Sequence, residues 1–209
     1  MLICYSTTVD SIGREIFPLW CKTHGIQIIE VFSKKELINL AHSVPDLLIS
    51  DRTSFIFDKD WLENIGFPVV NVHPSMLPSH RGSYPIFWSA LLGSKWGVTI
   101  HEVSKGIDDG PIVNQIEIPY ENTWTFQDLY TKYRSVAQRM LEELVETFQV
   151  ERHLVSKPQS QGMHIVHMKR ETEPLLERLS KRWDTRIIDA RHELSGEITS
   201  AVVRQGRKW

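Results

Sequence analysis

Short apolar runs alternate with amphipathic stretches through the first quarter of the chain. Residues 1–5, 25–32 and 46–50 are rich in apolar and β-branched positions, a pattern typical of strands. Residues 10–24 carry apolar side chains at helical intervals and end before a glycine, and 34–42 predict a second, shorter helix. This β-α-β-α-β order predicts the first half of a doubly wound, mostly parallel α/β sheet of Rossmann-like type with right-handed crossovers.

The next part of the chain predicts further strands and one long helix. Residues 67–70 form an apolar run typical of a buried strand, and 97–103 and 112–119 predict two more strands. Residues 125–148 open with a Thr-x-x-Asp capping signal, and apolar side chains then recur every three to four positions. That stripe predicts a helix packed on the core.

Beyond the long helix the chain becomes polar and loses this regularity. We divide it into a main domain, residues 1–150, and a small C-terminal extension, residues 151–209. Because short exposed strands often pair between molecules, a homodimer contact is expected in this extension. The extension predicts a linker, a basic strand-like piece, a short helix and a β-hairpin: residues 157–162, 163–170, 173–179, and the runs around Ile187 and from Thr199 to Val203.

Composition narrows the expected partners. The chain has 209 residues, of which 41% are hydrophobic and 24% charged, as in ordinary globular proteins. A net charge of −2 gives no bulk reason to expect nucleic acid or an anionic membrane as a partner. No apolar run approaches the roughly 18 residues that cross a bilayer, and the first residues lack the segments of a signal peptide. We therefore expect a cytoplasmic protein.

Candidate catalytic side chains follow the strand at 67–70. Asn71 and His73 come at its carboxyl end, where open α/β sheets bind their ligands, and alternation points both to one face. His73 is a candidate base because an imidazole titrates near neutral pH, and Asn71 is a candidate uncharged donor to an oxyanion. Asp108 and Asp109 follow the strand at 97–103, and we expect one of these carboxylates to pair with His73.

Other classes of chemistry have weaker support. The turn after the first strand lacks the Gly-x-Gly-x-x-Gly of dinucleotide-binding proteins, so a nicotinamide cofactor is not expected. A zinc hydrolase using His73, His101 and Asp108 is a second enzyme class, but the metal-binding motifs of such enzymes are missing and no metal is expected. His101, inside a predicted strand, is interpreted as a core histidine. A ligand-binding module without turnover is a third class.

Several separated motifs resemble, in order and spacing, the formyltransferases that use 10-formyltetrahydrofolate, over roughly residues 45–150. The resemblance implies a formyltransferase fold, this folate as the formyl donor, and catalytic roles for Asn71, His73 and Asp108. The motifs are Asn-x-His-Pro-Ser-x-Leu-Pro from Asn71, Arg81-Gly82 with Pro85-Ile86 and Trp88, Gly97-Val-Thr-Ile-His101, and Ile107-Asp-x-Gly110.

The same resemblance implies binding residues. In the family, the loop after the third strand lines the folate pocket, where apolar side chains flank the flat pterin. The alternative, that the aromatic residues of this loop belong to the core, stays open. The expected folate-binding residues are Arg52, Ser54, Phe55, Ile56, Phe57 and Asp108. The expected acceptor-binding residues are Ser75, Met76, Arg81, Gly82 and Tyr84.

The segment from Arg81 to Trp88 most resembles the formyltransferases that act on UDP- or dTDP-linked amino sugars, enzymes of cell-surface polysaccharide biosynthesis. In that interpretation Arg81 meets the charge of the diphosphate. Glycinamide ribonucleotide or another small amine is the alternative acceptor, although those enzymes carry a glycine-rich phosphate loop that this chain lacks. Methionyl-tRNA formyltransferases also resemble the segment, but they have a second, basic domain and a positive charge suited to tRNA.

Overall fold

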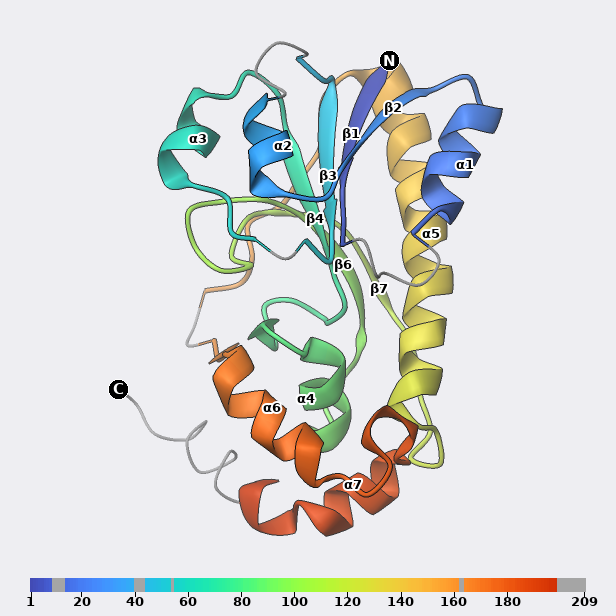
Figure 1. Ribbon diagram of the computed structural model, residues 1–209, viewed down its shortest axis with the longest axis vertical. Helices are drawn as coiled ribbons and strands as arrows, with labels where there is room; N and C mark the ends of the chain where they lie inside the picture. The colour runs from blue at the N-terminus through green and yellow to red at the C-terminus, as the bar shows by residue number, and fades with distance from the viewer. Residues whose placement is uncertain (9–13, 40–43, 54, 162–163, 199–209) are drawn as a thin grey trace.

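A six-stranded sheet forms the centre of the computed structural model (Figure 1), which describes residues 1–8, 14–39, 44–53, 55–161 and 164–198. The strand order is β2-β1-β3-β4-β6-β7; the first four strands run parallel, and β6 and β7 are antiparallel to their neighbours. The predicted mostly parallel sheet is confirmed. Its strands are β1 (Leu2–Ser6), β2 (Gln27–Val31), β3 (Leu47–Asp51), β4 (Val69–His73), β6 (Gly97–Glu102) and β7 (Ile112–Glu117).

Helices cover both faces of the sheet, as expected for a doubly wound fold (Figure 1). One face carries α1 (Ile16–Thr23) and α5 (Phe126–Glu151), and the other carries α2 (Lys34–Asn39) and α3 (Lys59–Asn64). The predicted ends of two helices, within 10–13 and 40–42, lie outside the described residues. None of the described helices is both long and apolar enough to cross a membrane.

The predicted capping signal forms at the start of α5. The Thr125 hydroxyl accepts from the Asp128 N–H at 3.0 Å, and the Asp128 carboxylate accepts from the Thr125 N–H at 2.8 Å. Two N–H groups that have no partner within the helix are thereby satisfied. The helix then buries the expected stripe: Leu129, Tyr133, Val136, Met140, Leu144 and Phe148.

Replacing Thr125 with alanine should lower the free energy of unfolding by about 1 kcal/mol, because it leaves the Asp128 N–H without its side-chain partner. Urea denaturation followed by circular dichroism measures the change. Thr131→Ala is the control, since that exposed hydroxyl bonds only to the Gln127 carbonyl one turn earlier in the same helix. Equal losses in the two variants would contradict a specific capping contribution.

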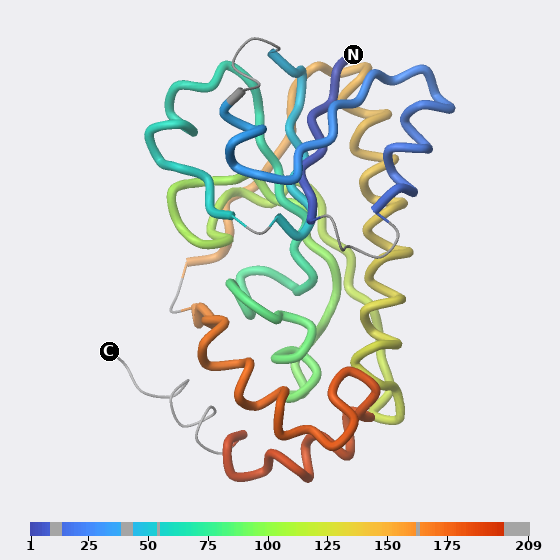
Figure 2. The backbone as a smooth tube through the Cα atoms, in the orientation of Figure 1, coloured from blue at the N-terminus to red at the C-terminus, as the bar shows by residue number. Residues whose placement is uncertain are grey.

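The C-terminal extension starts near the N-terminus, where α5 ends, and its later residues, 164–198, fold back beside α4 (Pro85–Leu92) at the opposite end of the molecule (Figure 2). Its strand β8 (Val166–His167) pairs with β5 (Arg81–Gly82). The basic strand-like piece predicted at 163–170 therefore contains a short strand that has a partner within the chain. Helical segments follow, among them α6 (Lys169–Arg178), the 3₁₀ turn η2 (Arg182–Asp184) and α7 (Ile187–Glu193).

The hairpin strand predicted around Ile187 is wrong, because this stretch is the helix α7. Ile187, Ala190 and Leu194 are fully buried in the main core, and their spacing places them on one face of a helix. The adjacent isoleucines had suggested a strand. In the structure the buried side chains are instead three to four residues apart, which is the spacing of a helix. The second predicted strand, Thr199 to Val203, lies outside the described residues.

Candidate functional site

The proposed catalytic side chains lie at the carboxyl end of β4, in the middle of the sheet. The strand extends further than expected and includes both Asn71 and His73. Both side chains contact Asp108, so they share one face, while Val72 between them is buried in the core. The antiparallel pairing of β6 with β4 sets His101 directly opposite Asn71. Four polar side chains therefore converge on this edge.

The Asp108 carboxylate is the centre of the cluster. Its Oδ2 accepts from the Gly82 N–H at 2.8 Å and lies 3.5 Å from Nδ1 of His73. Its Oδ1 accepts from Nδ2 of Asn71 at 3.4 Å and lies 3.5 Å from Nε2 of His101. Asp108 has a φ of 48°, a left-handed conformation that is uncommon outside glycine and recurs at functional sites. The neighbouring Asp109 is exposed.

The hydrogen bonds of His73 define which ring nitrogen can take a proton. Nε2 lies 2.9 Å from the His80 carbonyl oxygen, which can only accept, so Nε2 carries the hydrogen. In the neutral ring, the basic lone pair is then on Nδ1, beside Asp108. The ring itself is only 4% exposed. The accessible member of the pair is Asp108, whose side chain is 17% exposed.

His101 is the buried histidine that its position within a strand suggested, and it also contacts Asn71 and Asp108 of the cluster. The ring is buried, with Nδ1 2.9 Å from the Glu102 carbonyl oxygen and Nε2 3.2 Å from Nδ2 of Asn71. In the neutral form, Nδ1 donates to Glu102 and Nε2 accepts from Asn71. The Asn71 amide is consequently held by His101 on one side and Asp108 on the other.

The electrostatics favour a neutral imidazole beside an ionised carboxylate. Burial lowers the pKa of His73 below its ordinary value, with Asp108 opposing this effect and His101 and Arg81 adding to it. Burial alone would raise the pKa of Asp108, but His73, His101 and the Gly82 N–H hold it well below its ordinary value. At neutral pH the pair is therefore ready to accept one proton.

Gly82 lets the backbone approach the cluster closely, because a glycine has no side chain. Its φ is 85°, and a Cβ at this position would lie 2.3 Å from the His167 carbonyl oxygen. The close approach lets β5 pair with β8 while the Gly82 N–H reaches Asp108.

Two further histidines lie beside this loop. The rings of His80 and His167 stack with centroids 5.3 Å apart, and burial lowers their pKa values to about 4 and about 3. Both rings are neutral supports of the loop at neutral pH.

Arg52, an expected folate-binding residue, is part of an ion cluster at the end of β3. Asp51 is fully buried and accepts from the hydroxyl of Tyr5 at 2.6 Å, and from Arg134 at 2.7 Å and Arg52 at 3.1 Å. Burial would raise the pKa of Asp51, but the two guanidinium groups hold it at about 2. Arg52 also bonds to the Tyr130 hydroxyl. Ser54, the next candidate, lies outside the described residues.

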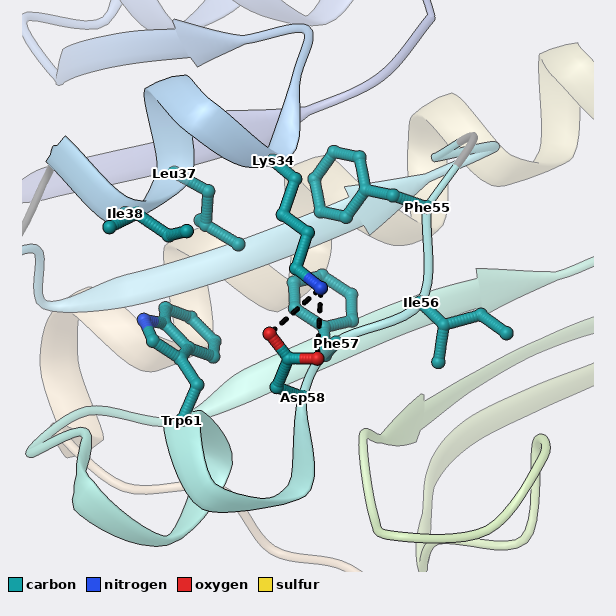
Figure 3. Close-up of a pocket in the computed structure, with 8 residues that line it drawn as sticks. All are labelled: Lys34, Leu37, Ile38, Phe55, Ile56, Phe57, Asp58 and Trp61. Carbon is teal, nitrogen blue, oxygen red and sulfur yellow. Dashed lines mark hydrogen bonds and ion pairs between the residues drawn. The ribbon is translucent and has the colours of Figure 1, made fainter.

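The apolar side chains of the loop after β3 point to two sides (Figure 3). Phe55 and Phe57 join the small core under α2, with ring centroids 5.6 Å apart, and Phe57 stacks on Trp61. Ile56 points away from Trp61 and is 80% exposed. Of these three expected folate-binding residues, Ile56 is therefore the one whose side chain is free to cover a ligand.

The expected acceptor-binding residues differ in their access. Ser75 is fully buried and donates to the Ser79 carbonyl at 2.7 Å, so its hydroxyl shapes the loop. Met76 is half-buried, close to Gly97. The Tyr84 hydroxyl donates to Glu173 of the extension at 3.1 Å. Arg81 is half-buried, and its guanidinium donates to Gln159 at 2.7 Å.

No metal-binding group emerges from this geometry. Within the described residues, no three or more His, Cys, Asp or Glu side chains are arranged to hold a metal ion. The ring nitrogens of His73 and His101 instead contact backbone carbonyls, Asn71 and Asp108.

Comparison with known proteins agrees with the fold. The methionyl-tRNA formyltransferase of Geobacillus sp. (strain WCH70) is 30% identical over 140 residues, which are 63% of this chain and 44% of that protein. That of Thermotoga maritima (strain ATCC 43589 / DSM 3109 / JCM 10099 / NBRC 100826 / MSB8) is 33% identical over 142 residues, 64% of this chain and 45% of the relative. The chain thus spans less than half the length of these curated relatives.

Among solved structures, the formyltransferase PseJ from Anoxybacillus kamchatkensis superposes with a TM-score of 0.78 at 24% identity, covering 91% of this chain and 97% of PseJ. That structure is a complex with UDP-4,6-dideoxy-4-formamido-L-AltNAc and tetrahydrofolate. The family model described as formyl transferase matches residues 19–145, more than half of the 209-residue chain. The chain belongs to the formyl transferase family.

Proposed function

We propose that the protein transfers a formyl group from 10-formyltetrahydrofolate to the exocyclic amine of a UDP- or dTDP-linked amino deoxysugar. The observation that carries this proposal is the cluster of Asn71, His73 and His101 around Asp108 at the carboxyl end of β4. It supplies what formyl transfer needs, namely a donor for a developing oxyanion and a base for the amine proton.

In the proposed reaction the amine nitrogen forms a bond to the formyl carbon, and the carbonyl oxygen becomes negative in the tetrahedral intermediate. The Asn71 amide donates to this oxygen. The amine proton passes to Nδ1 of His73 on the side where Asp108 lies, and Asp108 stabilises the imidazolium. The bond from carbon to N10 of the folate then breaks, and N10 receives a proton from the imidazolium.

The surroundings of the cluster fit a flat donor. The loop after β3 presents the exposed Ile56, and the loop between β6 and β7 carries Asp108. These loops follow strands on either side of β4 in the sheet. We infer that the pterin lies between them, with Ile56 against its face, and that Arg52 contributes to the rim.

Two observations support a sugar nucleotide as the acceptor. The PseJ structure, with 97% of its chain covered, holds a UDP-linked formamido sugar and tetrahydrofolate. The Arg81 guanidinium is half-buried near the cluster, where it can pair with a diphosphate oxygen. Methionyl-tRNA is the second candidate acceptor, because the relatives at 30% and 33% identity are named methionyl-tRNA formyltransferases.

An acceptor panel tests the proposal. We expect purified protein with 10-formyltetrahydrofolate to formylate a UDP- or dTDP-linked 3-amino or 4-amino sugar, with tetrahydrofolate release followed by absorbance and the added formyl group by mass spectrometry. Methionyl-tRNA and glycinamide ribonucleotide are tested in parallel. Transfer to one of these alone would overturn the sugar acceptor. Binding of folate without transfer to any acceptor would favour a binding module, and turnover that requires added zinc would favour a hydrolase.

A further inference from the structure

Gln159, in the stretch expected to be a linker, makes four hydrogen bonds to two parts of the site. Its Nε2 donates to the carbonyl oxygens of Asp108 and Gly110, each at 2.8 Å. Its Oε1 accepts from Nη2 of Arg81 at 2.7 Å and from Nε at 3.3 Å. The two hydrogens and two lone pairs of the amide are therefore all used.

The backbone around Gln159 is itself anchored. Two residues earlier, Lys157 exchanges both backbone hydrogen bonds with Ile112, at 2.7 and 2.8 Å, so the chain leaving α5 adds to the edge strand β7. Ser156 also bonds to the Glu102 carboxylate at the end of β6. The amide of Gln159 thus reaches the site from a fixed position.

Asp108 and Arg81, the two residues that Gln159 contacts, both need a neighbouring group to hold them in place. Asp108 has the left-handed φ of 48°, and its carboxylate must stay 3.5 Å from His73. Arg81 is a long side chain that would otherwise sample many rotamers. The side-chain amide of Gln159 thus fixes both the backbone of Asp108 and the guanidinium of Arg81.

We propose that Gln159 is a positioning residue that couples the Asp108 loop to Arg81, so that the carboxylate beside the base and the cation for the acceptor are held in one geometry. This inference rests on the proposed function. It assigns the C-terminal extension a part in the active site, since Gln159 bridges the loops that carry Asp108 and Arg81.

The chemistry of the position is specific to glutamine. A glutamate keeps the acceptor for Arg81 but has no hydrogen for the two carbonyls, which would then face a carboxylate oxygen. An alanine removes both sets of contacts. Gln159→Ala should therefore disturb Asp108 and Arg81 together, and Gln159→Glu should release the Asp108 loop while neutralising Arg81.

In steady-state kinetics, Gln159→Ala should lower kcat roughly 10- to 100-fold, because displacement of a reacting group by about 1 Å has costs of this size. For Gln159→Glu we expect a similar fall in kcat and a larger rise in the KM for the nucleotide sugar, since Arg81 is then paired with a carboxylate. Gln138→Ala is the matched control, a half-buried glutamine on α5 that donates to Glu142 one turn later in the same helix, and it should keep wild-type kinetics.

A second measurement needs no turnover, so it separates this inference from the proposed function. Titration of the histidine Cε1–H signals by NMR reports the pKa of His73, whose charged neighbours are Asp108, His101 and Arg81. If Gln159 holds the Asp108 carboxylate in place, Gln159→Ala should move this pKa downward, and Gln138→Ala should not. An unmoved His73 titration and unchanged kcat, even with a lower Tm, would overturn the positioning role and leave Gln159 a purely structural residue.

Discussion

Replacing Asn71 with alanine should lower kcat by roughly 10²- to 10³-fold, a loss of about 3 to 4 kcal/mol of transition-state stabilisation. The amide lies at the end of β4, held by Asp108 at 3.4 Å and His101 at 3.2 Å. Both contacts are long, which leaves the donor able to turn to an oxygen that gains charge during the reaction. Because the oxygen of the formyl group is much less negative before attack, the KM for the folate donor should change little.

Stopped-flow or steady-state assays on one acceptor check this expectation. Asn64→Ala is the control, since that exposed asparagine bonds only to the Asp60 carbonyl on α3. A large rise in the KM with unchanged kcat would assign Asn71 to ground-state binding of the donor. Loss of activity together with a large fall in Tm would instead indicate that the amide is needed to keep His101 and Asp108 together.

The features of this site that could be predicted from the sequence are those that depend on the pattern of neighbouring residues. Asn71 and His73 follow an apolar run at alternate positions, so strand geometry alone places them on one face at the carboxyl end of the strand. The same reasoning predicted the capping box of α5 and its buried stripe. These features depend on neighbours within a few residues.

The part that was missed depends on register and long-range packing. His101 faces Asn71 only because β6 runs antiparallel to β4 with this one register, and a shift of one residue would turn its ring to the other face. Its signal was present in the Gly97-Val-Thr-Ile-His101 motif, which we interpreted as a strand with a core histidine. Gln159 carries no local signal, because its partners lie about 50 and 78 residues earlier in the chain.

The C-terminal extension illustrates a similar limit. Adjacent β-branched residues at Ile187 favour a strand locally, yet α7 packs against α4, and Ile187, Ala190 and Leu194 are fully buried in the core. The basic strand-like piece at 163–170 forms the short strand β8, which pairs with β5 at Gly82, where only a glycine permits the approach. Tertiary contacts thus decide the conformation of the segments whose local preferences are weak.

Replacing Asp108 with asparagine should lower the maximal rate by roughly 10²- to 10⁴-fold and shift the pH dependence of the remaining activity. His73 must be neutral to accept the amine proton, so kcat/KM for the donor should rise with pH through the pKa of the imidazole. Burial lowers that pKa below the ordinary value, and the rise should therefore lie on the acid side of a free histidine. The amine of the acceptor adds its own ionisation, which the profile for the acceptor reports separately.

The direction of the shift follows from the charge that is removed. The Asp108 carboxylate, 3.5 Å from Nδ1, favours the imidazolium and so raises the pKa of His73 against the effect of burial. Without that charge the rising limb of the pH profile should move to still lower pH. The plateau of the profile should fall, because the imidazolium formed during proton transfer is less stabilised. Asp109→Asn, which removes an exposed carboxylate one residue further on, should leave the limb in its wild-type position. If Asp108→Asn keeps both the limb and the plateau of the wild type, the carboxylate only supports the loop and does not assist His73.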